Sequence, residues 1–288
     1  MFHLRTQTLL LTLLAMMAFA ANSLLCRMAL GDPSIDAASF TGIRLASGAL
    51  VLWLLLVRRS GEWRLRPNPK SALFLFAYAA AFSFAYLQLD AGVGALILFG
   101  AVQLTMVAAG LLAGEPSPPL TWFGLALSSG GLVYLVSPGL TAPPLSGALL
   151  MGLAGIAWGL YSLSGRGVAD PLQATAGNFL GAVPLGLLLI LPFLGSLHLS
   201  PRGIALALAS GALASGLGYV IWFAALRGLS ASAAASVQLS VPVLAAIGGV
   251  LWLGEAFTWR LTLASALILG GIALVLRSKG LLQARAER

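Results

Sequence analysis

Apolar residues along this chain gather into long runs that recur over its whole length, separated by short polar stretches. A helix of about 20 apolar residues is long enough to cross a hydrocarbon core of ~30 Å. We therefore predict an all-α membrane protein with ten transmembrane helices, at 7–30, 36–57, 70–88, 92–113, 119–137, 145–165, 172–194, 202–225, 231–253 and 259–276. The remaining segments are too short for a soluble domain.

The composition agrees with a lipid environment. Hydrophobic residues make up 59% of the chain and charged residues only 8%, whereas soluble domains carry about 25% charged residues. The first run has the outline of a secretory signal peptide, with AFA (18–20) as a cleavage site. Because the apolar run continues through NSLLCRMAL, we expect this segment to be retained as the first helix. The single Cys26 excludes an intramolecular disulfide and a cysteine metal cluster.

The net charge of +8 marks an orientation rather than a nucleic-acid surface, because the cations are not clustered on an amphipathic or aromatic-rich face. Cations concentrate in cytoplasmic loops of membrane proteins. A cytoplasmic N-terminus leaves only Arg202 and Arg260 in outer loops, and it places on the inner side Arg5, Arg58, Arg59, Arg64, Arg66, Lys70, Arg166, Arg227, Arg277, Lys279, Arg285 and Arg288. We predict that both termini are cytoplasmic.

The chain repeats itself at a shift of 140 residues. LDAGVGA (89–95) then aligns with LSASAAA (229–235), and LLAGE (111–115) aligns with LWLGE (251–255). We predict two five-helix repeats, residues 1–140 and 141–288. Because five is odd, the second repeat enters the membrane from the opposite side, which gives an inverted repeat around a central cavity. The alternative is a duplication retained only for stable packing.

These features resemble the drug/metabolite transporter superfamily, EamA type, and within it the YddG-type bacterial exporters of aromatic amino acids. The resemblance covers essentially the whole chain. It implies a multi-pass protein of the bacterial inner membrane that moves a small-molecule substrate by alternating access. One departure is that the fourth helix carries Gln103 and no proline, while the ninth contains VQLSVPV (237–243) with the proline that the family commonly shows.

The inventory of reactive groups argues against an enzyme. His3 and His198 are the only histidines, and both fall outside the predicted membrane helices. No Walker A lysine is found, so ATP is excluded as the direct energy source. All eight acidic residues fall in loops or at helix ends, whereas proton-driven pumps usually carry a carboxylate inside the membrane. We expect gradient-driven transport that is uncoupled from protons, or else coupling through a group that the sequence does not identify, with no cofactor and no metal. A membrane-embedded hydrolase is the rival class.

Neutral polar side chains near mid-membrane and aromatic side chains indicate the substrate site. Polar groups at this depth normally face a cavity or the bundle interior. Aromatic residues repeat every four positions in the third helix, although ordinary packing explains that pattern equally well. We propose as substrate-binding residues Asn22, Tyr78, Phe82, Tyr86, Gln103, Trp158, Tyr161, Ser162, Asn178 and Gln238. We assign Tyr219, Trp222 and Phe223 instead to the aromatic belt at the cytoplasmic interface.

Five further residues are candidates for gating or structural roles. Arg27 and Arg44 lie inside predicted helices, where each could form a clamp with Asp32 or Asp36, or meet a substrate carboxylate at the outer vestibule. Pro242 removes a helix hydrogen bond and is a candidate flex point. The last two, Glu115 and Glu255, are expected to cap the helices that follow them.

Together these observations predict an inner-membrane exporter of amino acids with aromatic or bulky apolar side chains. The first alternative is an exporter of drugs or other metabolites on the same fold. The remote alternative is a membrane enzyme or scaffold that transports nothing. The expected partners are the small-molecule substrate and the lipid bilayer, with no nucleic acid, and we expect the monomer to be functional.

Overall fold

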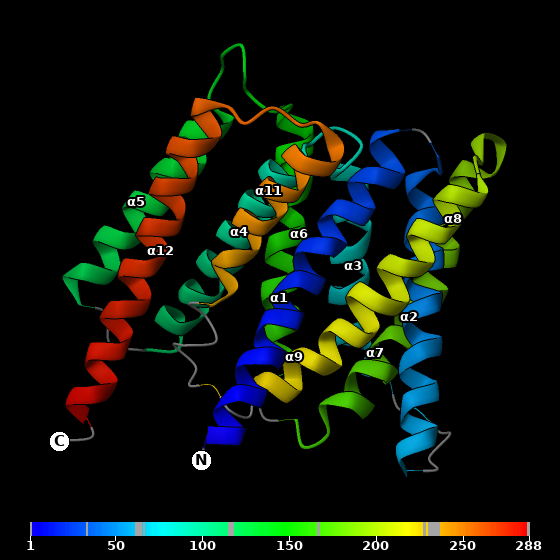
Figure 1. The fold of residues 1–288 in the computed structure, drawn as a ribbon, viewed down its shortest axis with the longest axis horizontal. Coiled ribbons are helices and arrows are strands. Elements are labelled where there is room, and N and C mark those ends of the chain that lie inside the picture. Colours follow the sequence, from blue (N-terminus) through cyan, green and yellow to red (C-terminus); the bar gives the residue numbers. More distant parts are fainter. Residues whose placement is uncertain are drawn as a thin grey trace.

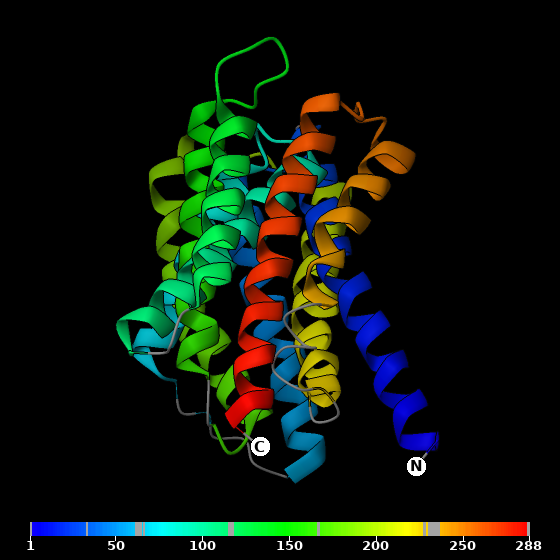
Figure 2. The ribbon, with the colours of Figure 1, turned by 90° about the vertical axis from the view of Figure 1, so that its left-hand side faces the viewer.

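The structure is a computed structural model that describes residues 2–32, 34–60, 65, 67–114, 118–165, 168–226, 229 and 237–286. Its helices run up and down through one bundle, and the two chain ends lie at the same end of that bundle (Figure 1; Figure 2). Within the described residues, β-structure is limited to a single bridge between Ile35 and Leu199.

The elements follow the apolar runs closely. In chain order they are α1 (Phe2–Gly31), α2 (Ala37–Ser60), α3 (Pro69–Ala85), α4 (Ala91–Leu112), α5 (Pro119–Val136), α6 (Leu145–Ser164), α7 (Pro171–Ile190), the 3₁₀-helix η1 (Leu191–Ser196), α8 (Pro201–Leu208), the π-helix η2 (Ala209–Leu217), α9 (Gly218–Leu226), α11 (Ser240–Leu253) and α12 (Trp259–Ala286). The first part of the ninth predicted helix, residues 231–236, lies outside the described residues.

Eight helices in the described part of the chain are long and apolar enough to cross a membrane, and α3 and α11 are shorter apolar helices. The protein is therefore a multi-pass, all-helical membrane protein. The count of ten crossings and the inverted repeat stay predictions.

Local sequence explains where several helices begin and end. α3, α7 and α8 each start with a proline, which fits the first helical turn. Asn68, Asp170 and Ser200 precede these prolines, and their side chains accept hydrogen bonds from backbone N–H groups of the first turn. Gly114 follows α4 with φ 80°, and Gly254 follows α11 with φ 66°. The two glycines of the repeated Gly-Glu pair thus both adopt the left-handed conformation that terminates a helix.

Helix pairs pack through small residues. α5 and α12 lie side by side at one edge of the bundle (Figure 1). A Cβ added at Gly124 of α5 would lie 2.5 Å from the carbonyl oxygen of Gly271 in α12, so only glycine permits this approach. In the same way, Gly48 of α2 faces Phe179 of α7 and the carbonyl of Gly211 in η2. These contacts bring η2 directly against α2.

Candidate functional site

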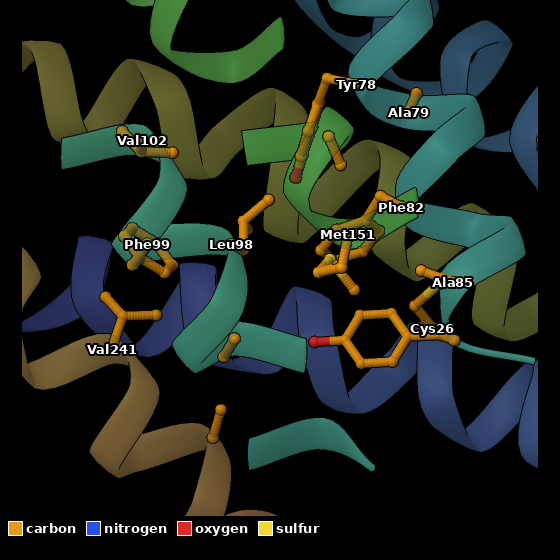
Figure 3. Packing of buried hydrophobic residues seen from close by; sticks show 14 of the residues in the cluster. Cys26, Tyr78, Ala79, Phe82, Ala85, Leu98, Phe99, Val102, Met151 and Val241 are labelled. Carbon is orange, nitrogen blue, oxygen red and sulfur yellow. The ribbon is translucent and has the colours of Figure 1, made fainter. Parts of the chain in front are cut away.

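A small cavity lies in the middle of the bundle. Its walls come from both halves of the chain, and the lining residues are Phe19, Asn22, Ser23, Tyr78, Phe82, Leu98, Phe99, Trp158, Ala214 and Tyr219. Figure 3 shows Tyr78 and Phe82 of α3 and Leu98 of α4 extending toward the same space. The cavity volume is about 20 Å³, which is room for about one water molecule. The space is therefore too small for an amino acid in this conformation.

Aromatic rings form most of the wall, with Trp158 of α6 at their centre. Its ring centroid lies 4.8 Å from that of Tyr78, 5.0 Å from that of Tyr219 and 5.4 Å from that of Tyr161. Phe19 of α1 meets Tyr219 edge-on at 6.0 Å. These distances fall in the range where aromatic rings attract one another. The rings pack against one another, and they could pack against the ring of a flat apolar solute in the same way.

A row of hydrogen bonds runs along one side of the cavity. The Ser210 hydroxyl donates to Asn22 Oδ1 at 2.7 Å, and Asn22 Nδ2 donates to the Tyr78 hydroxyl at 3.3 Å. Arg44 Nη2 donates to the same hydroxyl at 3.0 Å, and Arg44 Nε donates to Ser215 Oγ at 3.3 Å. The row connects η2, α1, α3 and α2.

The π-helix explains why two serines of one helix join this row. Ser210 and Ser215 both lie in η2. In an α-helix, residues five apart point roughly 140° away from each other. A π-helix bonds residues i and i+5, so the same two residues stack on nearly one side. π-helical turns occur frequently at functional sites.

Arg44 is buried, and none of the carboxylates in the described part of the chain pairs with it. It is 2% exposed, its guanidinium carbon lies 5.1 Å from the Tyr78 ring centroid and 5.0 Å from that of Phe82, and Nη1 has no hydrogen-bond partner. The expected clamp with Asp32 or Asp36 is wrong for this residue. Asp32 pairs with Arg202 at 3.2 Å, and the Asp36 carboxylate accepts from the backbone N–H groups of Ser39 and His198.

Arg27, near the C-terminal end of α1, has the opposite environment and lies by the loops that join α3 to α4 and α11 to α12. Arg27 Nε lies 3.2 Å from Glu255 Oε1, and Nη2 lies 3.3 Å from Asp90 Oδ1. Nη1 also donates to the backbone oxygen of Tyr86 at 3.2 Å. Arg27 is thus a clamp, but its carboxylates are Asp90 and Glu255 rather than Asp32 and Asp36. We call Arg27, Asp90 and Glu255 the outer ion cluster, after the side of the membrane on which the predicted orientation would place it.

Glu255 does not cap the helix that follows it, so that expectation is wrong. Both of its carboxylate oxygens accept from the backbone N–H of Ala91, the first residue of α4, at 2.9 Å. The left-handed turn at Gly254 folds Glu255 back over Gly249, where a Cβ would collide with Glu255 Oε2. The hydroxyl of Thr258 accepts the N–H of Leu261 at 3.1 Å and caps α12 instead. The other expected cap, Glu115, lies outside the described residues.

The outer ion cluster is only partly shielded from water. Burial raises the pKa of the Glu255 carboxyl, while the N–H of Ala91 and the charge of Arg27 offset part of that rise. The Glu255 side chain is 9% exposed, compared with 47% for Asp90. Glu255 is therefore the member whose charge depends most on its neighbours.

Of the ten residues proposed from the sequence as substrate-binding, the structure brings Asn22, Tyr78, Phe82 and Trp158 together around the cavity. Two others lie next to this group: Tyr161 contacts Trp158, and the Tyr86 ring meets Phe82 edge-on at 4.8 Å while its hydroxyl donates to the backbone of Ala91. The remaining four do not line the cavity: Gln103, Ser162, Asn178 and Gln238.

Sequence reasoning also missed several residues of the site. Tyr219 lines the cavity and is 5% exposed, so its assignment to an interfacial belt is wrong. Phe19, Phe99 and Ala214 carry no polar signal that would single them out in an apolar helix. Ser210 and Ser215 lie in SGALAS (210–215), where a serine pair was the available signal.

Pro242 lies in the first turn of α11, shortly after a break in the helical backbone. It occupies the third position of α11, after a turn at Leu239. Val237 and Gln238, before that turn, are also helical, so the helical backbone is interrupted just ahead of Pro242, and its role as a flex point stays a prediction. Pro184 lies deeper within a helix, in α7.

Comparison with known proteins shows which family the chain belongs to. A protein of Pseudomonas aeruginosa, described as uncharacterized, is 59% identical over 271 residues, which is 94% of each chain. The family described as EamA-like transporter family matches residues 145–277. The chain belongs to the EamA-like transporter family. The resemblance to the EamA type is thereby confirmed, and the family is one of transporters, not enzymes. The likeness to YddG-type exporters stays a prediction.

More distant relatives agree with this assignment. The threonine/homoserine exporter RhtA of Escherichia coli (strain K12) is 27% identical over 78% of this chain and 77% of that protein. The uncharacterized inner membrane transporter YedA of the same strain is 26% identical over 85% and 83%. A solved crystal structure with 20% identity superposes with a TM-score of 0.68 over 96% of this EamA-like chain and 99% of its own length, and it shares the fold.

Proposed function

We propose that this protein exports amino acids with aromatic or bulky apolar side chains across the bacterial inner membrane by alternating access. Its energy source would be the gradient of the solute itself, without ATP. The observation that carries the proposal is the central cavity, whose lining residues come from α1, α3 and α4 of the first half and from α6, η2 and α9 of the second. A site at the interface of two halves can be opened to either side when the halves move.

Two inverted five-helix repeats, 1–140 and 141–288, are the arrangement that we propose for this movement. The packing of the helices supports it, since several of the main contacts have a counterpart when the halves are exchanged. α3 packs on α6 as α9 packs on α1, and α4 packs on α6 as α11 packs on α1. The equivalent pairs α2 and α7, α4 and α11, and α5 and α12 also pack on each other. Ten crossings then place both termini on one side, which the positive-inside rule makes the cytoplasm.

The closed cavity fits an intermediate of such a cycle. With about 20 Å³ it cannot hold an amino acid, so helices must separate before the solute enters. The outer ion cluster ties α1 to the start of α4 and to the α11–α12 loop, and we propose that it keeps the outer side closed in this conformation. Release of the solute to the outside would require these contacts to break.

The lining favours a solute with a flat apolar side chain. Burying an aromatic side chain of 150–250 Å² contributes roughly 4–6 kcal/mol at ~25 cal/mol/Å² before ordering costs. A second candidate solute is threonine or homoserine, because RhtA is described as their exporter. The row of Asn22, Ser210 and Tyr78 would offer hydrogen bonds to a side-chain hydroxyl.

Counterflow in proteoliposomes tests this function. Vesicles loaded with an unlabelled amino acid should accumulate the labelled one transiently, with tryptophan and phenylalanine ahead of alanine and lysine. If threonine and homoserine exchange faster than tryptophan and phenylalanine, the proposed solute class becomes the second candidate, threonine or homoserine. Movement of cationic drugs but of no amino acid would overturn the proposal. Exchange that requires a proton gradient would overturn the expectation of uncoupled transport.

A further inference from the structure

The buried Arg44 has hydrogen-bonding capacity that the described residues leave unused. A guanidinium carries five N–H donors, and the structure shows bonds from Nε to Ser215 and from Nη2 to Tyr78, while Nη1 has none. A buried charge without a partner is costly, so such groups are normally paired with an opposite charge. Arg44 therefore lacks the partner that its burial calls for.

The carboxylates of the described residues are engaged elsewhere. Arg27 holds Asp90 and Glu255 at the outer ion cluster. The other three carboxylates lie next to helix ends and have partners there: Asp32 pairs with Arg202, Asp36 accepts from Ser39 and His198, and Asp170 pairs with Arg59. What stabilises Arg44 in the closed state is the set of neutral oxygens and the faces of two aromatic rings.

The guanidinium lies directly behind the cavity wall. Both rings over which it sits, those of Tyr78 and Phe82, line the cavity, and Ser215 is adjacent to the lining residue Ala214. A solute in the cavity can therefore reach the guanidinium only when these rings move aside. Arginine binds carboxylates through two parallel N–H groups, a geometry that the free side of this guanidinium can provide.

We propose that Arg44 is the anchor for the carboxylate group of the transported solute, so that the solute itself supplies the missing counter-charge. This inference rests on the proposed function, because it assumes that the solute enters the central cavity. It narrows the substrate class to solutes that carry a carboxylate, such as amino acids, and it excludes amines and cationic drugs, which the charge of Arg44 repels.

The test compares matched solutes that differ only in the carboxylate. Labelled tryptophan exchange is competed with unlabelled tryptophan, tryptophan amide and tryptamine, and the series is repeated with threonine and threonine amide. The wild type should prefer the carboxylate over the amide by at least roughly 30-fold, which corresponds to about 2 kcal/mol at 1.4 kcal/mol per tenfold change. Equal competition by the amide and the acid would overturn the proposal.

Variants of the arginine separate an anchor from a merely structural group. Arg44→Gln should bring the preference for the carboxylate close to 1, and Arg44→Lys should retain part of it, because lysine keeps the charge but not the two parallel donors. The matched control is Arg202→Gln, which removes an arginine from an exposed pair and should keep the wild-type preference. If Arg44→Gln keeps the full wild-type preference for the carboxylate over the amide, the proposal that Arg44 anchors the carboxylate is wrong.

Thermal stabilisation of the purified protein in detergent keeps the two proposals distinguishable. Carboxylate solutes should raise the melting temperature of the wild type and of Arg202→Gln, but not that of Arg44→Gln. Stabilisation by carboxylates that depends on Arg44, without any counterflow, would leave the anchor standing and reject the transport function. Counterflow that treats acid and amide alike would reject the anchor alone. If Arg44→Gln does not fold, the test uses Arg44→Lys instead: its preference for the acid over the amide should be lower than that of the wild type, and an unchanged preference would contradict the anchor.

Discussion

Arg27 and Arg44 are both arginines within the helical bundle, yet the structure gives them contrasting surroundings. Arg27 contacts two carboxylates and a backbone oxygen. Arg44 is more deeply buried, and its partners are two hydroxyl groups and two aromatic rings. The first charge is neutralised by the protein itself, so it can hold helices together. The second is left for an anion from outside. The set of partners, rather than the residue type or its depth, separates a clamp from a binding group.

The largest effect should come from giving Arg44 a carboxylate of its own. Ser215 accepts from Arg44 Nε at 3.3 Å, so Ser215→Asp would place a carboxylate beside the guanidinium and make Arg44 resemble Arg27. Close charge pairs of this kind are worth about 2–5 kcal/mol. We expect exchange of carboxylate solutes to fall by roughly 30-fold or more, because each 1.4 kcal/mol is tenfold.

Ser215→Asn is the matched control for this variant, since it has nearly the same size and no charge. It should retain most of the exchange measured in proteoliposomes. Equal loss in both variants would show that space at this buried position, rather than charge, is the cause. Full exchange in Ser215→Asp would show that Arg44 does not need to be free.

The second effect should come from removing the charge that neutralises Arg27. Glu255→Gln keeps an acceptor for the N–H of Ala91 but removes the charge next to Arg27. We expect the free energy of unfolding to fall by about 2 kcal/mol, because hydrogen bonds between charged groups contribute about 1.5–3 kcal/mol. Asp90→Asn should cost less than about 1 kcal/mol, since this carboxylate is 47% exposed.

Thermal unfolding in detergent measures both variants. A larger loss in Asp90→Asn than in Glu255→Gln would reverse the ranking that burial predicts. The preference for carboxylate solutes should survive in both variants, because neither residue contacts Arg44. A changed preference would mean that the two arginines are not independent.

The sequence located the helices well because the length of an apolar run is a local property. The predicted run 119–137 and the helix Pro119–Val136 differ by a single residue at one end. Asn22, Tyr78, Phe82 and Trp158 were found at the site because polar and aromatic side chains at mid-membrane depth point to a pathway. The distinction between Arg27 and Arg44 could not be found in this way, since it depends on partners from distant parts of the chain.

Three physical causes explain the misplaced site residues. Depth along a helix does not say which way a ring points, so Tyr219 was taken for an interfacial residue although it faces Trp158. A change from α- to π-helical turns rotates the following side chains around the helix axis. In η2 this rotation places Ser215 within hydrogen-bonding distance of Arg44. The carboxylate of Glu255 reaches a helix that begins 164 residues earlier, while nearness in sequence favoured the helix that follows it.

A third, smaller effect should distinguish the two hydroxyl groups along α3. The Tyr78 hydroxyl accepts from both Arg44 and Asn22, whereas the hydroxyl of Tyr86 donates to the backbone oxygen of Ala91. Tyr78→Phe leaves two buried donors without their acceptor, and we expect it to lower the free energy of unfolding by about 1–2 kcal/mol. Tyr86→Phe should cost about 0.5–1 kcal/mol. Chemical denaturation measures both, and equal losses would show that Arg44 does not depend on Tyr78.

The smallest effect should come from breaking the ion pair between Arg59 and Asp170, which lies at the end of the bundle that holds the chain termini. Arg59 pairs with Asp170, which also caps α7 through the N–H groups of Leu172 and Gln173. Burial pushes the pKa of Asp170 upward, but the hydrogen bonds from Arg59 and the backbone outweigh it, so the pKa lies below its ordinary value of 3.8. The ionised carboxylate is thus favoured by folding. Its contribution is present above pH 3.8 and disappears as the pH falls through the lower pKa of the folded state.

Asp170→Asn isolates this ion pair, because asparagine is an equally good helix cap. The variant should be less stable than the wild type by at most about 1 kcal/mol near neutral pH, since the pair is exposed. The difference should shrink with added salt and should vanish in acid, where Asp170 is protonated. Thermal unfolding at a series of pH values measures it. A difference that grows as the pH falls would contradict the sign of the pKa shift, and a difference as large as that of Glu255→Gln would show that exposure does not separate surface pairs from the outer ion cluster.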